Sequence, residues 1–150
     1  MPNSFSQIYF HLIIVVSGRL NLINHNWQEE LYKYINGIVM HKKQKLICIN
    51  GTSNHLYLLI NTRTDCCISD LVRDLKANSS KFVNENEWAL GKFHWQQGSG
   101  IFSVSHSQVE KVKAYILDQE VHHKTVLFED EYREFIKAHN IPFKEEYLFD

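Results

Sequence analysis

Residues 44–61 read QKLICINGTSNHLYLLIN, and they predict a β-hairpin near the middle of the chain. The runs from Gln44 to Ile49 and from His55 to Asn61 are rich in residues that favour strands. Asn50-Gly51 between them is a strong turn signal, although the loop is longer than two residues. We therefore expect two neighbouring antiparallel strands here.

The segment before the hairpin predicts a strand and a helix, and the segment after it a second helix. The nearly apolar run from Ile8 to Ser17 is typical of a central strand, and Gly18 ends it. Asn26 is expected to cap a helix that continues to about Ile38. A further helix is predicted over residues 68–84, where apolar residues mark one face: Ile68, Leu71, Val72, Leu75, Phe82 and Val83.

The rest of the chain adds a short strand and two helices. We expect a loop over residues 86–100, a strand over 101–105, helices over 107–122 and 129–139, and an irregular tail. The order βαββαβα predicts an α+β fold, a ferredoxin-like or RRM-like antiparallel-dominated sheet with helices packed on one face. Because no linker or repeat is evident, we expect one domain over residues 1–150.

The composition excludes several classes of protein. With 44% hydrophobic and 22% charged residues, the chain is neither disordered nor of low complexity. The longest apolar run, from Ile8 to Val16, is about half of a membrane span, and no basic region precedes it. Three cysteines, Cys48, Cys66 and Cys67, are too few for a disulfide framework. These features predict a cytoplasmic protein without a membrane segment.

Charge is unevenly distributed along a chain whose net charge is −1. Residues 127–150 carry seven acidic and three basic side chains, whereas residues 1–126 carry ten acidic and thirteen basic ones. This balance permits a small nucleic-acid site, although duplex-coating proteins usually have a larger basic excess. The candidate DNA-binding residues are Lys42, Lys43 and Lys45 at a helix end, and Arg73 and Lys76. Compensation of the helix dipole is an ordinary alternative role for the three lysines at the helix end.

Two pairs of residues could carry chemistry. His55 and Tyr57 share one strand face because side chains alternate with period 2, and we expect this face to be polar and near the surface. Tyr115 and Gln119 are four residues apart on the helix predicted over 107–122, so they lie side by side. If that helix packs on the strand face, the four residues form one site. Spacing alone favours structural roles, a half-buried histidine beside an interfacial tyrosine and a core-edge tyrosine beside a solvated glutamine.

An ordered set of motifs gives a more specific indication. They are EELYKYI at 29–35, NGTSNHLYLLI at 50–60, LVRDLKANSSK at 71–81, WQQGSGIFSVS at 95–105, YILDQEVHH at 115–123 and EYL at 146–148. From about Ile8 to Asp150, the chain resembles the single-tyrosine transposases of the HUH superfamily. These proteins move small insertion sequences as single-stranded DNA, and they include the REP-associated tyrosine transposases.

The resemblance implies a chemistry and a set of site residues. Tyr115 matches the family's tyrosine, which attacks a DNA phosphate, forms a 5′-phosphotyrosine and releases a 3′-OH. His55 matches the first histidine of a His-hydrophobe-His motif, and Gln119 matches a third metal ligand. The implied cofactor is Mg²⁺ or Mn²⁺, which polarises the scissile phosphate. The implied substrate is single-stranded DNA with hairpin ends, and the implied assembly is a homodimer with active sites completed in trans.

The chain departs from the family pattern at two positions. Tyr57 stands where the second motif histidine, a metal ligand, is expected, and Ser99 stands where the family has a Gly-Tyr-Gly turn. A neutral phenol is a poor replacement for an imidazole ligand. Two hypotheses follow: a transposase that cleaves and rejoins single-stranded DNA, or a domesticated, catalytically weakened protein that binds hairpin DNA. Tyr115 and Gln119 favour the first hypothesis, and Tyr57 favours the second.

Overall fold

The computed structural model describes residues 5–18, 22–118, 127–144 and 148–149. Its centre is an antiparallel sheet of four strands in the order β2-β3-β1-β4. The strands are β1 (Ile8–Val15), β2 (Lys45–Gly51), β3 (His55–Thr62) and β4 (Gly100–Val104). With α1 after β1 and α2 after β3, the chain follows the βαββαβ order of a ferredoxin-like fold, which confirms the predicted α+β class.

The described helices are α1 (His25–His41), α2 (Ile68–Glu85), the short η1 (His106–Gln108), α3 (Val109–Leu117) and α5 (Phe128–Ala138). The cap of α1 is Asn24 rather than the expected Asn26, because the Asn24 side chain accepts a 2.8 Å hydrogen bond from the backbone N–H of Asn26. None of the described helices is long and apolar enough to cross a membrane.

Helix α3 is shorter than the sequence predicted. The expected helix extended to His122, but α3 ends at Leu117. At Asp118 the backbone leaves helical geometry, and its N–H bonds to the carbonyl of Tyr115, three residues back. The remainder of the predicted helix lies outside the described residues.

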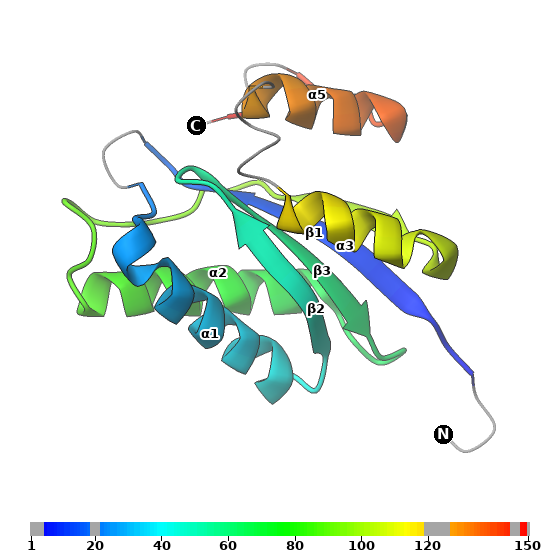
Figure 1. The fold of residues 1–150 in the computed structure, drawn as a ribbon, viewed down its shortest axis with the longest axis horizontal. Coiled ribbons are helices and arrows are strands. Elements are labelled where there is room, and N and C mark those ends of the chain that lie inside the picture. The colour runs from blue at the N-terminus through cyan, green and yellow to red at the C-terminus, as the bar shows by residue number, and fades with distance from the viewer. Residues whose placement is uncertain (1–4, 19–21, 119–126, 145–147, 150) are drawn as a thin grey trace.

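Helices cover both faces of the sheet, which corrects the expectation that they pack on one face only. Figure 1 shows α1 and α2 on one side of the strands and α3 and α5 on the other. Leu12 and Ile14 of β1 join the core under α1 and α2, while Ile13 and Val15 join the core under α3 and α5. A central strand that is apolar on both faces must be covered on both faces to bury its side chains.

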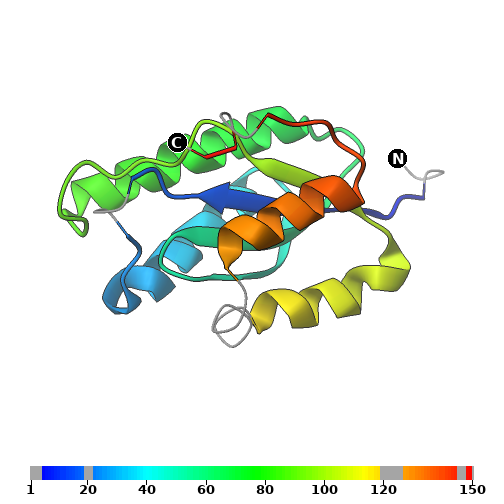
Figure 2. The same ribbon diagram turned by 90° about the horizontal axis from the view of Figure 1, so that it is seen from above.

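The hairpin between β2 and β3 places His55 at one end of the sheet. In the register of the two central strands, His55 lies opposite Val15, and Tyr57 lies opposite Ile13. Gly51 belongs to the tight start of this turn, because a Cβ there would lie 2.1 Å from the carbonyl oxygen of His55. Figure 2, seen from above, shows α5 lying across the strands next to α3, over the face that holds Tyr57.

Candidate functional site

His55, Tyr57 and Tyr115 meet on one face of the sheet within a single chain. The ring centroids of His55 and Tyr57 are 4.9 Å apart, and those of Tyr57 and Tyr115 are 6.1 Å apart with the rings inclined by 19°. The first two residues come from β3, and Tyr115 comes from the last turn of α3. Gln119, the fourth residue of the predicted site, lies outside the described residues.

Asn50 holds the end of α3 against β2. Its side-chain Nδ2 donates to the backbone carbonyls of Ile116 at 3.1 Å and Leu117 at 3.0 Å. These carbonyls are among the last of the helix, which have no partner within the helix itself. These two bonds therefore fix the helix turn that carries Tyr115. The position of the tyrosine thus depends on Asn50, the first residue of the Asn50-Gly51 turn.

The hairpin loop orients the ring of His55. Its Nδ1 lies 2.8 Å from Oδ1 of Asn54 and 3.0 Å from Oγ1 of Thr52, and the Thr52 hydroxyl donates to the same Asn54 oxygen at 3.0 Å. Because Oδ1 of Asn54 is an acceptor, the arrangement favours a proton on Nδ1 of His55. The other nitrogen, Nε2, then carries the lone pair, as a metal-binding or proton-accepting histidine requires.

Tyr57 is fully buried, contrary to the expectation that this strand face is polar and near the surface. Its hydroxyl donates a 2.8 Å hydrogen bond to Oε1 of Glu131 on α5. Burial raises the pKa of Tyr57 far above its usual range, and the charge and hydrogen bond of Glu131 act in the same direction. Tyr57 therefore remains a neutral donor.

Two residues of α5 contribute to the site without having been singled out in the sequence. The ring of Phe128 stacks on that of His55, with centroids 4.0 Å apart and an angle of 12°. Burial raises the pKa of Glu131 to about 7, against the lowering effect of the Tyr57 hydrogen bond. The spacing of Phe128, Tyr132 and Ile136 indicates a buried helix face, but no local signal identifies Tyr57 as the partner of Glu131.

A second buried histidine lies next to Tyr57. The rings of His11, on β1, and Tyr57 meet edge to face with centroids 4.9 Å apart. Burial lowers the pKa of His11 to about 4, and the nearby charge of His139 acts in the same direction. Within the described part of the chain, Nε2 of His11 has no hydrogen-bond partner. His11 is thus a neutral, structural neighbour of the site.

The described residues at this site do not fit the ligand set that the resemblance implies for a metal ion. No group of three His, Cys, Asp or Glu side chains that could hold a metal is found among the residues that the structure describes. His55 presents a nitrogen in the ligand form, but Tyr57 is a neutral phenol whose hydroxyl is engaged by Glu131. We therefore derive no reaction step through a metal ion.

The five candidate DNA-binding residues lie away from the two tyrosines. Lys42 pairs with Asp74, and Arg73 pairs with the same aspartate at 3.2 Å and with Asp70 at 3.1 Å. The hydrogen bonds from Lys42 and Arg73 hold the pKa of Asp74 below its usual range. Helices α1 and α2 cover the sheet face opposite Tyr57, so these residues are not part of the tyrosine site.

The other three lysines also have defined positions. Lys43 and Lys45 are exposed at the turn from α1 to β2, and Lys45 pairs in register with Asn61, at the end of β3 farthest from His55. The ammonium group of Lys76 donates to the backbone carbonyls of Gln96 at 2.6 Å and Gln97 at 2.9 Å. Lys76 thus anchors a loop, and a DNA-binding role for any of the five residues stays a prediction.

Comparison with known proteins identifies the family. The sequence model of a transposase family described as IS200-like matches residues 4–119, and the chain belongs to this family of transposases, which act on DNA. No curated protein matches the chain in sequence.

Two solved structures share the fold. A candidate transposase from Deinococcus radiodurans is similar with a TM-score of 0.59 and 18% identity, covering 78% of this chain and 94% of that one. A REP-associated tyrosine transposase, solved bound to a REP hairpin, is similar with a TM-score of 0.63 and 13% identity, covering 79% of this chain and 70% of that one. At these identities the likeness establishes the fold alone.

Proposed function

We propose that the chain is a transposase that binds hairpin-forming single-stranded DNA and cleaves it with Tyr115 as the nucleophile. The position of Tyr115 carries this proposal. Its half-buried ring is held at the end of α3 by the Asn50 bonds and lies against Tyr57, on the sheet face that also holds His55. A tyrosine fixed in this way has the preorganisation that attack on a phosphate requires.

The proposed reaction is a transesterification. The side-chain oxygen of Tyr115 loses its proton and attacks a DNA phosphorus, the bond from phosphorus to O3′ breaks, and the released O3′ gains a proton as a 3′-OH. The DNA is then joined through its 5′ phosphate to the tyrosine. Attack by another 3′-OH reverses the step and rejoins the strands, so no external energy source is needed.

Cleavage is proposed to depend on Mg²⁺ or Mn²⁺, and the basis for this is the family resemblance alone. The chemistry of the described residues supports one ligand, His55, whose Nδ1 is held by Asn54. Cleavage assays in the presence of Mg²⁺, Mn²⁺ or a chelator test this dependence. The protein is further proposed to be a cytoplasmic homodimer, and light scattering coupled to gel filtration measures the oligomeric state.

A second candidate function is the binding of hairpin DNA without cleavage. Two observations favour it: Phe128 covers the ring of His55, and Glu131 engages the hydroxyl of Tyr57 at the position of the second motif histidine. A protein with this function binds a hairpin but forms no covalent adduct with it under any metal condition. Adduct formation therefore separates the two candidates.

The test uses single-stranded hairpins copied from the DNA that flanks the chain's own gene. We expect a covalent protein–DNA adduct in a denaturing gel with the wild type and with Tyr34→Phe, whose ring stacks on Phe82 beneath the other sheet face. We expect no adduct with Tyr115→Phe. The proposal is wrong if Tyr115→Phe still forms the adduct, or if random duplex DNA binds as tightly as the hairpins at physiological salt.

A further inference from the structure

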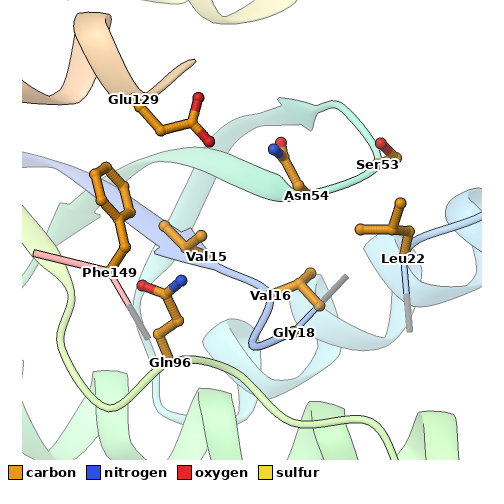
Figure 3. Close-up of a pocket in the computed structure, with 9 residues that line it drawn as sticks. All are labelled: Val15, Val16, Gly18, Leu22, Ser53, Asn54, Gln96, Glu129 and Phe149. Atoms are coloured by element: carbon orange, nitrogen blue, oxygen red, sulfur yellow. The ribbon is translucent and has the colours of Figure 1, made fainter. Parts of the chain in front are cut away.

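A cavity of about 540 Å³ opens beside the candidate site, at the end of β1. Figure 3 shows the described residues around it, which come from the end of β1 and the segment after it, the hairpin loop, the loop before β4, α5 and the C-terminal segment. The apolar wall includes Val15, Val16 and Phe149, and the polar groups include Asn54, Gln96 and Glu129. A cavity of this size and mixed lining is typical of a small-molecule or nucleotide subsite.

Gln96 is the polar group that most directly indicates a ligand. Its residue is only 8% exposed, and Figure 3 shows its amide pointing into the cavity. Two hydrogen bonds fix the backbone of Gln96. Its N–H donates to the carbonyl of Val15 at 2.8 Å, and its carbonyl accepts from the ammonium group of Lys76 at 2.6 Å. Within the described part of the chain, the side-chain amide has no hydrogen-bond partner. An amide that faces a cavity and has no bond to the protein is placed to bind something that enters the cavity.

The lining chemistry matches a nucleobase. A glutamine amide offers one acceptor and one donor side by side, the pattern with which it pairs to an amino group and an adjacent ring nitrogen. The carboxylate of Glu129 is a further acceptor for an amino group, and it disfavours a phosphate in the cavity. The ring of Phe149 and the valine side chains suit the apolar faces of a heterocycle.

Asn54 lies between the cavity and the candidate site. This residue lines the cavity, and its Oδ1 also contacts Nδ1 of His55 at 2.8 Å. A base in the cavity therefore lies next to the loop residue that orients the ring of His55. We infer that the cavity is a subsite for one unpaired base beside the candidate site, selective for a base that presents an amino group next to an unprotonated ring nitrogen, as adenine and cytosine do on their pairing edges. This inference rests on the proposed function.

The test compares DNA hairpins that share one stem, copied from the DNA flanking the gene, and differ in a single-stranded extension of adenine, cytosine, thymine or abasic nucleotides. Binding is measured by fluorescence anisotropy. We expect the wild type to bind adenine or cytosine extensions about tenfold more tightly than thymine or abasic ones. Gln96→Leu should remove this preference, while Gln97→Leu, the exposed neighbour, should keep it.

The outcomes separate the cavity from the proposed function. Equal binding of all extensions by the wild type, or an unchanged preference in a folded Gln96→Leu, overturns the inference and leaves the proposed function standing. If Gln96→Leu does not fold, Glu129→Gln replaces it, and an unchanged preference in that variant overturns the inference. Failure of the wild type to bind any hairpin overturns the proposed function, and the subsite with it.

Discussion

The hydroxyl of Tyr57 donates a 2.8 Å hydrogen bond to Oε1 of Glu131, which joins β3 to α5 across 74 residues of sequence. Both residues are buried, and both have a raised pKa. The position that the family pattern gives to a metal-binding histidine is therefore occupied by a neutral phenol with a partner in its own chain. This bond makes α5 part of the candidate site.

Tyr57→Phe removes the donor to Oε1 of Glu131 while keeping the ring. We expect the free energy of unfolding to fall by about 1–3 kcal/mol at pH 8, because a buried carboxylate oxygen loses its hydrogen bond. Urea denaturation measures the loss. Tyr34→Phe is the matched control, since that ring stacks on Phe82 beneath the other sheet face. An equal loss in the two variants contradicts a stabilising role of the bond.

Glu131 and His11 give opposite pH dependences of stability. The pKa of Glu131 is raised from 4.5 to about 7, so the folded protein binds more protons than the unfolded chain in this window. Stability from this group is therefore lost as pH rises from about 4.5 to 7. The pKa of His11 is lowered from 6.5 to about 4, so stability from this group is gained as pH rises from about 4 to 6.5.

Variants at these two positions should separate the opposing effects. Relative to wild type, Glu131→Gln should gain about 3 kcal/mol in the free energy of unfolding as pH rises from about 4.5 to 7. His11→Leu should lose a similar amount relative to wild type as pH rises from about 4 to 6.5. Denaturation curves at several pH values measure both differences. Difference curves that stay flat with pH would show that neither group is perturbed by burial.

Phe128→Ala should uncover His55. Removing a buried ring that stacks on the imidazole should lower the free energy of unfolding by about 3 kcal/mol and expose the histidine to solvent. Diethyl pyrocarbonate modification, followed by peptide mass spectrometry, measures how fast His55 reacts. Leu127→Ala is the control, because that side chain is 69% exposed. Unchanged reactivity of His55 in Phe128→Ala would show that the ring does not protect it.

Tyr57→His restores the histidine that the family pattern expects. Metal-dependent cleavage should increase by about tenfold, by analogy with the loss that follows when support of a metal ligand is removed. Stability should fall, because Tyr57 is fully buried and its hydroxyl is bonded to Glu131. Cleavage across a Mn²⁺ titration and thermal unfolding measure the two effects. An unchanged cleavage rate at saturating Mn²⁺ would show that residue 57 does not occupy a ligand position.

The elements that the sequence predicted well depend on local signals. The hairpin around Asn50-Gly51, the helix over 68–84 and the helix over 129–139 each carry their own periodicity or turn residues, and each is present. The apolar run at β1 also contained the information that both sheet faces are covered, since its side chains are apolar on both sides. A strand with this pattern predicts helices on both faces rather than on one.

Other features depend on contacts between distant segments, which one sequence does not reveal. His55 and Tyr57 suggested a polar face, but Phe128 and Glu131 from the far end of the chain bury both residues. The guanidinium of Arg73 pairs with two aspartates of α2, a contact that its charge alone did not reveal, and its DNA-binding role stays a prediction. Residue type alone therefore predicted a more open and more polar site than the fold provides.

Mapping the covalent adduct tests the role of Tyr115 most directly. Trypsin should release residues 114–124 and residues 46–63 as separate peptides, and each contains one tyrosine, Tyr115 in the first and Tyr57 in the second. After incubation with the flanking hairpins and Mn²⁺, mass spectrometry should find a nucleotide phosphate joined to the peptide of residues 114–124. A nucleotide on the peptide of residues 46–63, or on neither peptide, would contradict the role of Tyr115 as the nucleophile.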